Sequence, residues 1–211
     1  MTIEFSNKEH DAIRAAIKNG EKKTSAEIFA VLAQRSDDYQ FVAMSFFAFW
    51  IFIVSVFLVL LLGFYSVDVS LLHFVSAQFL AFICGYLILR GFPKLAITFT
   101  PQRIKHHRAH LNGIKQFLAH GIHNTKGRTG VLIFVSLEER YAEILVDGEI
   151  ENNIGREFWL EAVGELIASC KENKISNGYV RAIENTSEKL AVKFPRGRKK
   201  LNELEDKLII I

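Results

Sequence analysis

Two long apolar runs between residues 41 and 90 constrain this chain more than any other part of its sequence. They occupy residues 42–67 and 69–89, and Asp68 is the single charged residue in or between them. Each run reaches the roughly 20 residues that a helix needs to cross a bilayer core about 30 Å thick. Neither run has the polar face of a helix that packs on a soluble core. The sequence therefore predicts a transmembrane helical hairpin at residues 41–90.

The position of the first run argues against a cleaved signal peptide, because the run is too long and lies too far along the chain. Orientation follows from the flanking charges, since cytoplasmic flanks keep Lys and Arg. The connection at residues 65–70 contains neither, whereas Arg35 precedes the first run and Arg90 and Lys94 follow the second. We therefore expect a multi-pass protein with both termini in the cytoplasm.

The remaining sequence has the size and composition of one soluble domain. Outside the hairpin, roughly 160 of the 211 residues remain, which suits a single domain. The net charge of +3 is mild, and the basic residues gather near the membrane ends and in the tail. That distribution favours lipid headgroups over nucleic acid as the anionic partner. Cys84 lies in the second apolar run and Cys170 in a predicted helix, so we expect no disulfide.

Helix and strand patterns alternate on both sides of the hairpin. A capping box at Ser6 and Glu9 begins a helix that we expect Gly20 to end. The other predicted elements are a buried strand at 25–34, a helix at 101–124, strands at 131–137 and 141–146, and helices at 154–171 and 178–194. The first strand can join the later two in one sheet only if the hairpin is an insertion. We therefore predict an α/β fold, a small mixed sheet flanked by helices and interrupted by the transmembrane hairpin.

Four parts follow from this interpretation. They are residues 1–40, the first part of the α/β domain, 41–90, the hairpin, 91–195, the second part of the domain, and 196–211, a basic and amphipathic tail.

Several phrases recur in a characteristic order: AEIFAV in the first strand, TGVLIFVSLEERYAEILVDGEI over the later two, a helix opening on EFW and a later helix ending in FP. Together they resemble the TPM domain family over roughly residues 5–40 and 100–205. The chain is most similar to the bacterial membrane branch in which two transmembrane helices split the domain. This resemblance implies an α/β sandwich in a bacterial inner membrane. For some members it also implies a metal-assisted phosphatase activity.

Three acidic residues are candidate ligands for a divalent cation such as Ca²⁺ or Mg²⁺. Glu27 opens the first strand, and Asp147 and Glu149 follow the third, so they could gather at one edge of the sheet. Carboxylates that converge on a hard cation help it to polarise a phosphoryl oxygen and activate water. Solvated surface acids are the alternative interpretation. Many family members have a Gly-x-Gly phrase where this chain has Asp147, Gly148 and Glu149.

Five of the seven histidines lie between His106 and His123. His106 and His110 are four residues apart, which presents two imidazoles on one helix face and suits zinc or nickel. A third ligand is missing from the pattern. The alternative is a surface facing the lipid headgroups, whose positive charge rises below about pH 6.5.

Two further sets of residues are expected to act at the membrane. Ala77, Ala81 and Gly85 repeat every four residues in the second run, which lets another helix approach closely. The residues expected to contact lipid headgroups are Arg103, Lys105, Arg108, Arg196, Arg198, Lys199 and Lys200.

Two functions remain open from the sequence. The leading hypothesis is a domain held at the cytoplasmic face of a bacterial inner membrane that contacts lipids and binds other membrane proteins. It requires no certain cofactor and no nucleic acid, and it leaves homo-oligomerisation open. The alternative is a metal-dependent phosphatase that uses Glu27, Asp147 and Glu149.

Overall fold

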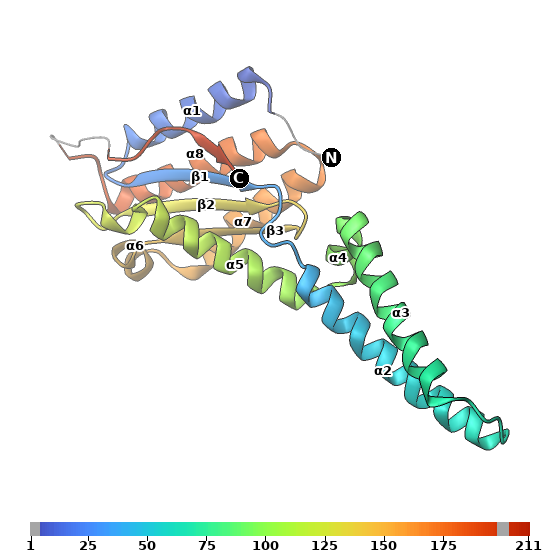
Figure 1. Ribbon diagram of the computed structural model, residues 1–211. Coiled ribbons are helices and arrows are strands. Elements are labelled where there is room, and N and C mark those ends of the chain that lie inside the picture. The colour runs from blue at the N-terminus through green and yellow to red at the C-terminus, as the bar shows by residue number, and fades with distance from the viewer. Residues whose placement is uncertain (1–4, 198–202) are drawn as a thin grey trace. The chain divides into compact units, whose positions relative to one another are not determined.

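The computed structural model describes residues 5–197 and 203–211. The chain divides into two compact units (Figure 1). The first combines Met1–Ser36 with His106–Ile211, and the second is Asp37–Lys105. The first unit therefore takes its residues from both sides of an insertion that contains the two apolar runs.

The first unit is built on a four-stranded sheet in the order β3-β2-β1-β4. Its strands are β1 (Glu27–Ala33), β2 (Gly130–Ser136), β3 (Tyr141–Val146) and β4 (Leu208–Ile210). β1 and β2 pair in parallel over seven residues although the insertion separates them, and β2 pairs with β3 antiparallel. The prediction of a mixed α/β fold is confirmed. β4 was not predicted, and it adds the end of the chain to β1 as a parallel strand.

Both faces of the sheet are covered, and the alternation of side chains along β1 shows how. Ile28, Ala30 and Leu32 point into a core shared with α1 (Asn7–Glu21), α6 (Gly148–Asn153), α7 (Arg156–Lys171) and α8 (Ile175–Lys193). Phe29, Val31 and Ala33 point to the other face, which α5 (Gln102–Ala119) and η1 (Ile122–Asn124) cover. Every residue of β1 and β2 is buried, which explains their continuous apolar sequences.

The first helix begins as the sequence predicts and ends differently. The Ser6 amide donates to Glu9 Oε2 at 2.8 Å, and the Glu9 amide donates to Ser6 Oγ at 3.4 Å, which completes the capping box. Gly20 does not end α1, which continues to Glu21. A Cβ atom at Gly20 would stand 2.1 Å from Ser187 Oγ of α8. The glycine therefore permits the close crossing of two helices.

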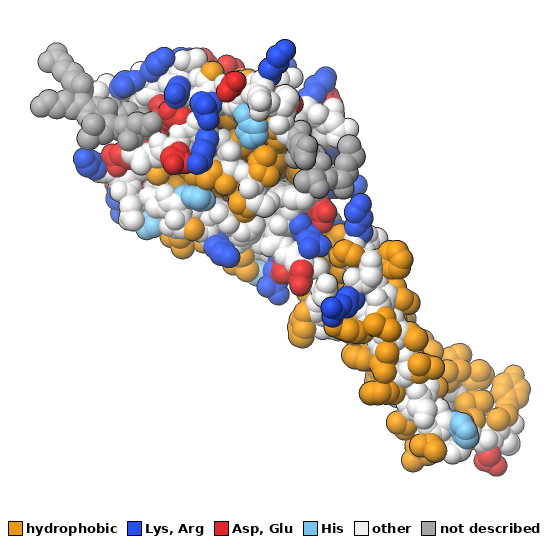
Figure 2. All heavy atoms as spheres, turned by 45° about the horizontal axis from the view of Figure 1, so that its top comes forward, with side chains coloured by type: hydrophobic (Ala, Val, Ile, Leu, Met, Phe, Trp, Pro, Cys, Tyr) orange, Lys and Arg blue, Asp and Glu red, His pale blue; other side chains and the backbone are white. Residues whose placement is uncertain are grey.

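The second unit contains α2 (Gln40–Phe64), α3 (Leu71–Gly91) and the short α4 (Pro93–Phe99). α2 and α3 are long and apolar enough to cross a membrane. Figure 2 shows hydrophobic side chains over much of their visible surface, as the many exposed Phe, Leu, Ile and Val side chains require. α4 was not predicted, and Ala96 and Ile97 bury it against the start of α2 and the end of α3.

The contact between α2 and α3 includes one of the three predicted packing residues. Gly85 is buried, and a Cβ atom there would stand 1.9 Å from the ring of Phe47. Ala77 and Ala81 are exposed. The less exposed face of α3 carries Gln78 and Leu89, so the helix is rotated relative to the predicted small-residue stripe.

Candidate functional site

The three predicted metal ligands lie near the same end of the sheet, where β1 and β2 begin and β3 ends, but they do not form one cluster. Glu27 is 2% exposed at the start of β1, where it pairs with Gly130. Asp147 is 5% exposed just after β3, and its amide donates to the Gly130 carbonyl at 3.0 Å. Gly130 at the start of β2 therefore has Glu27 on one side and Asp147 on the other. Glu149 is exposed in the first turn of α6.

The two buried carboxylates already have partners in the protein. Asp147 Oδ1 accepts from the Gly148 amide at 2.6 Å and from Arg128 Nη2 at 3.0 Å. Glu27 Oε2 accepts from the Glu203 amide at 3.4 Å. No group of three or more His, Cys, Asp or Glu side chains in residues 5–197 and 203–211 could hold a metal ion. Because calcium takes six to eight oxygen ligands, the three predicted residues do not fit such a site as they are placed.

The two predicted histidine ligands contact different residues of β3. The ring of His106 lies 5.3 Å from the ring of Tyr141, and His110 Nδ1 lies 2.9 Å from both carboxylate oxygens of Glu143. The helical spacing therefore brings each imidazole to its own partner on the neighbouring strand. Within the described residues, the two do not form part of a three-ligand metal group.

The predicted lipid-contacting residues do not form one patch on the first unit. Arg108 lies in the first half of α5, close to the start of β3, where the ring of His106 contacts Tyr141. Arg196 follows Pro195, which bridges to Thr24 before the start of β1. Arg108 and Arg196 therefore mark opposite ends of the sheet. Arg103 and Lys105 belong to the second unit, and Arg198, Lys199 and Lys200 lie outside the described residues.

A buried carboxylate that the sequence interpretation missed lies at the opposite end of the sheet from Glu27. Glu139 is fully buried, and it accepts from the Ser36 amide at 2.9 Å and from Ser136 Oγ at 2.5 Å. The Ser36 and Ser136 hydroxyls lie 2.7 Å apart, and Asn112 Nδ2 donates to Ser36 Oγ at 3.3 Å. This network joins the ends of β1 and β2 to α5. It lies where the chain passes from Ser36 into the inserted unit.

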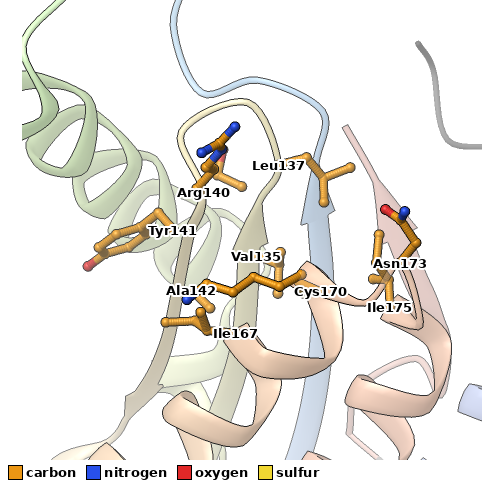
Figure 3. Close-up of a pocket in the computed structure, with 11 residues that line it drawn as sticks. Val135, Leu137, Arg140, Tyr141, Ala142, Ile167, Cys170, Asn173 and Ile175 are labelled. Atoms are coloured by element: carbon orange, nitrogen blue, oxygen red, sulfur yellow. The ribbon is translucent and has the colours of Figure 1, made fainter.

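A pocket of about 540 Å³ lies next to this network (Figure 3). The end of β2, the start of β3, the last turn of α7 and the first turn of α8 surround it. Apolar side chains from these elements line it: Val135, Leu137, Ala142, Ile167 and Ile175. Arg140, Lys171 and Asn173 also line it, and all three are exposed. The pocket therefore combines an apolar lining with two cations, which suits an apolar group that carries a negative charge.

The ionisable side chains of this pocket are poorly suited to nucleophilic or acid–base chemistry. Burial raises the pKa of the Cys170 thiol to about 11, so the thiol is protonated at neutral pH. Burial, followed by the negative charge of Glu143, also raises the pKa of Tyr141. Figure 3 shows the Tyr141 ring pointing away from the other labelled side chains. Both the Cys170 and the Tyr141 side chains are therefore protonated at neutral pH.

These features define a class of protein, a mixed α/β domain interrupted by a pair of apolar helices that could span a membrane. Neither a family model nor a curated protein matches the chain. It is similar to a solved structure, the NMR structure of the BA42 protein from the psychrophilic bacterium Bizionia argentinensis. The two are 18% identical with a TM-score of 0.61, and the match covers 100% of this chain and 97% of that one. At this identity the likeness concerns the fold alone.

Proposed function

We propose that this protein is a TPM-like domain anchored in a bacterial inner membrane, where it binds other membrane proteins at the cytoplasmic face. The observation that carries the proposal is the insertion itself. Two helices apolar enough to span a bilayer enter the chain between β1 and β2, and these strands still pair in parallel over seven residues. A domain interrupted in this way is held at the bilayer at both ends of the insertion.

Proximity is the proposed mechanism. Anchoring confines the domain and its partners to one surface, so the effective concentration of each for the other rises without any new contact. Exposed basic residues such as Arg108 add attraction to anionic headgroups, which is worth about 1 kcal/mol per Lys or Arg near the surface. The apolar pocket beside Arg140 and Lys171 offers a surface for partners.

Photo-crosslinking in native membranes followed by mass spectrometry tests this proposal. A light-activated amino acid would replace exposed residues of the first unit, Leu160 on α7 and, for comparison, Lys18 on α1. We expect crosslinks to other membrane proteins from at least one position. Recovery of lipid adducts alone would contradict the proposal, as would reporter fusions that place either terminus outside the cytoplasm.

A metal-dependent phosphatase is the second candidate function. In its favour, Asp147 Oδ2 is buried and has no hydrogen-bond partner among the described residues, which is costly for a carboxylate oxygen unless something neutralises it. Against it, Glu27, Asp147 and Glu149 form no three-ligand group. Calorimetry of the full chain with Ca²⁺, Mg²⁺ or Mn²⁺, paired with a phosphomonoester assay, tests this candidate. Metal binding and turnover that Asp147→Asn removes and that Glu161→Gln, at an exposed position on α7, retains would support it, and no metal binding would eliminate it.

A further inference from the structure

The outer edge of β3 is open. β3 is a terminal strand of the sheet, and no other strand of the described residues pairs with its far side. The Asp147 amide donates to the Gly130 carbonyl of β2, and such hydrogen-bonded pairs alternate along an antiparallel ladder. The intervening residues therefore direct their backbone groups outward: Ala142, Ile144 and Val146. Their amides and carbonyls can hydrogen-bond an added strand.

A groove runs along this edge, between β3 and α7. Its volume is about 630 Å³, within the range of about 300–1,000 Å³ for ligand sites. Ile144 and Val146 line it from the strand, and Trp159, Leu160 and Val163 line it from the helix. Trp159 Nε1 is buried and has no hydrogen-bond partner among the described residues. Such an apolar channel beside open backbone groups suits an extended chain, whose alternate side chains can enter it.

The two ends of the groove differ in charge. Tyr141 and Ala142 line both this groove and the 540 Å³ pocket, so the two are continuous at the start of β3. Arg140 and Lys171 line the pocket, and none of its lining residues is acidic. At the other end the charges of Glu151 and Arg156 offset each other. Glu143 also lines the groove near the start of β3, but it is one acid against two cations, and both its carboxylate oxygens lie 2.9 Å from His110 Nδ1. The start of β3 is therefore the positive end.

This asymmetry selects the direction and the kind of chain. A strand antiparallel to β3 ends beside Tyr141, and antiparallel pairing is slightly the more stable per residue. A free carboxyl terminus in that position lies near Arg140 and Lys171, and hydrogen bonds between ions are about twice as strong as neutral ones. The β3 strand of a second copy lacks a terminal carboxylate, and a helix cannot use the open backbone groups.

We propose that the groove between β3 and α7 binds the extended C-terminal segment of a partner protein. The segment adds a fifth strand to the four-stranded sheet, antiparallel to β3. Its alternate apolar side chains pack against Trp159 and Leu160, and its carboxylate lies beside Arg140 and Lys171. The inference rests on the proposed function and deepens it, because it names the chemistry of the partner and the surface that receives it.

Peptide binding to the full chain in lipid nanodiscs tests the inference. The probe is an array of decapeptides with randomised sequences and free carboxyl ends. Peptides that bind are resynthesised as the acid and as the C-terminal amide and titrated against the Trp50→Phe variant, in which Trp159 is the remaining tryptophan of two. We expect saturable binding with a blue shift of Trp159 emission. The amide should bind at least tenfold more weakly.

Variants with matched controls locate the site. Leu160, 62% exposed, and the exposed Lys171 can each be replaced by Glu without opening the core. Leu160→Glu should abolish binding, and Lys171→Glu should weaken it at least tenfold. Leu118→Glu on α5, where the side chain is 53% exposed, and Lys193→Glu at the end of α8 should leave the affinity unchanged.

Three results would overturn the inference: no peptide of the array binds, acid and amide bind equally, or Leu160→Glu leaves the affinity unchanged. Self-association of the chain that Leu160→Glu abolishes, without peptide binding, would assign the edge to a second copy and would also overturn it. Crosslinks to membrane proteins without peptide binding would refute the groove and leave the proposed function standing. Peptide binding without any crosslinked membrane protein would support the groove as a peptide site and refute the proposed function.

Discussion

Removal of the Glu139 carboxylate is expected to loosen the segment through which the chain leaves the first unit. Glu139 is fully buried and accepts from the Ser36 amide and the Ser136 hydroxyl, at 2.9 and 2.5 Å. Hydrogen bonds to a charged group contribute about 1.5–3 kcal/mol each. In Glu139→Ala the Ser136 hydroxyl can turn toward Ser36 Oγ, 2.7 Å away, whereas the Ser36 amide loses its acceptor. We therefore expect a loss of about 2–4 kcal/mol, below the sum of both bonds.

Hydrogen exchange measured by mass spectrometry on the full chain in nanodiscs can detect this loss locally. Because about 1.4 kcal/mol is a tenfold change in an equilibrium, the Ser36 amide should exchange at least tenfold faster in Glu139→Ala. Glu139→Gln keeps one acceptor oxygen and should show a smaller increase. The neighbouring Glu138→Ala is the control, since the Glu138 carboxylate makes a long ion pair of 3.9 Å with Arg35 and does not accept from Ser36. Equal exchange in Glu139→Ala and the wild type would refute this reasoning.

Three further predictions concern the first unit. Gly20→Val should destabilise the α1–α8 crossing by about 1–3 kcal/mol, because its Cβ would stand 2.1 Å from Ser187 Oγ, and urea unfolding measures the loss. Tyr179→Phe should cost about 1–2 kcal/mol in the same assay, because it removes a buried 2.6 Å hydrogen bond to a β1 carbonyl. Burial raises the pKa of Cys170 from 9.0 to about 11. Iodoacetamide should therefore modify it slowly at pH 8 in Cys84→Ser, and its contribution to stability should persist below pH 9 and disappear between pH 9 and about 11.

Uniform burial explains why much of the fold could be predicted. β1 and β2 are covered on both faces, so they appear in the sequence as continuous apolar runs, and their predicted bounds lie within two residues of the observed ones. Two helix bounds were less accurate: the helix predicted at 101–124 ends at Ala119, shortly before Gly121 takes a left-handed conformation, and the helix predicted at 178–194 begins at Ile175. β4 was missed because three residues carry too short a pattern, and its position depends on pairing with β1.

The candidate sites were harder to predict, since sequence does not show whether a charged group is buried. Glu138, Glu139 and Arg140 form a polar turn in the sequence, yet in the structure Glu139 is fully buried. Its partners Ser36 and Ser136 come from the two sides of the insertion, so local spacing could not reveal the whole network. The open edge of β3 likewise depends on strand order, which local patterns do not specify.

The first unit should fold when a short linker replaces Asp37–Lys105. Asn112 Nδ2 and Ser36 Oγ lie 3.3 Å apart, and His106 stands six residues before Asn112 on the same helix, about 9 Å along its axis. A Gly/Ser linker of about ten residues spans about 17 Å on average, which covers this distance. Each doubling of a loop costs only about 0.6 kcal/mol, so neither the insertion nor its removal should change the closure entropy greatly.

The shortened protein should be soluble without detergent and should unfold in one cooperative transition, followed by circular dichroism and Trp159 fluorescence. Glu139→Ala in the same background should lower the midpoint of unfolding, because the Ser36 amide then loses the acceptor that holds the end of β1 to the turn after β2. Fragments 1–36 and 106–211, expressed separately, should each remain unfolded, since β1 lies in one and its parallel partner β2 in the other. A shortened chain that stays unfolded while the full chain folds would show that the inserted helices are needed for folding as well as for the proposed anchoring.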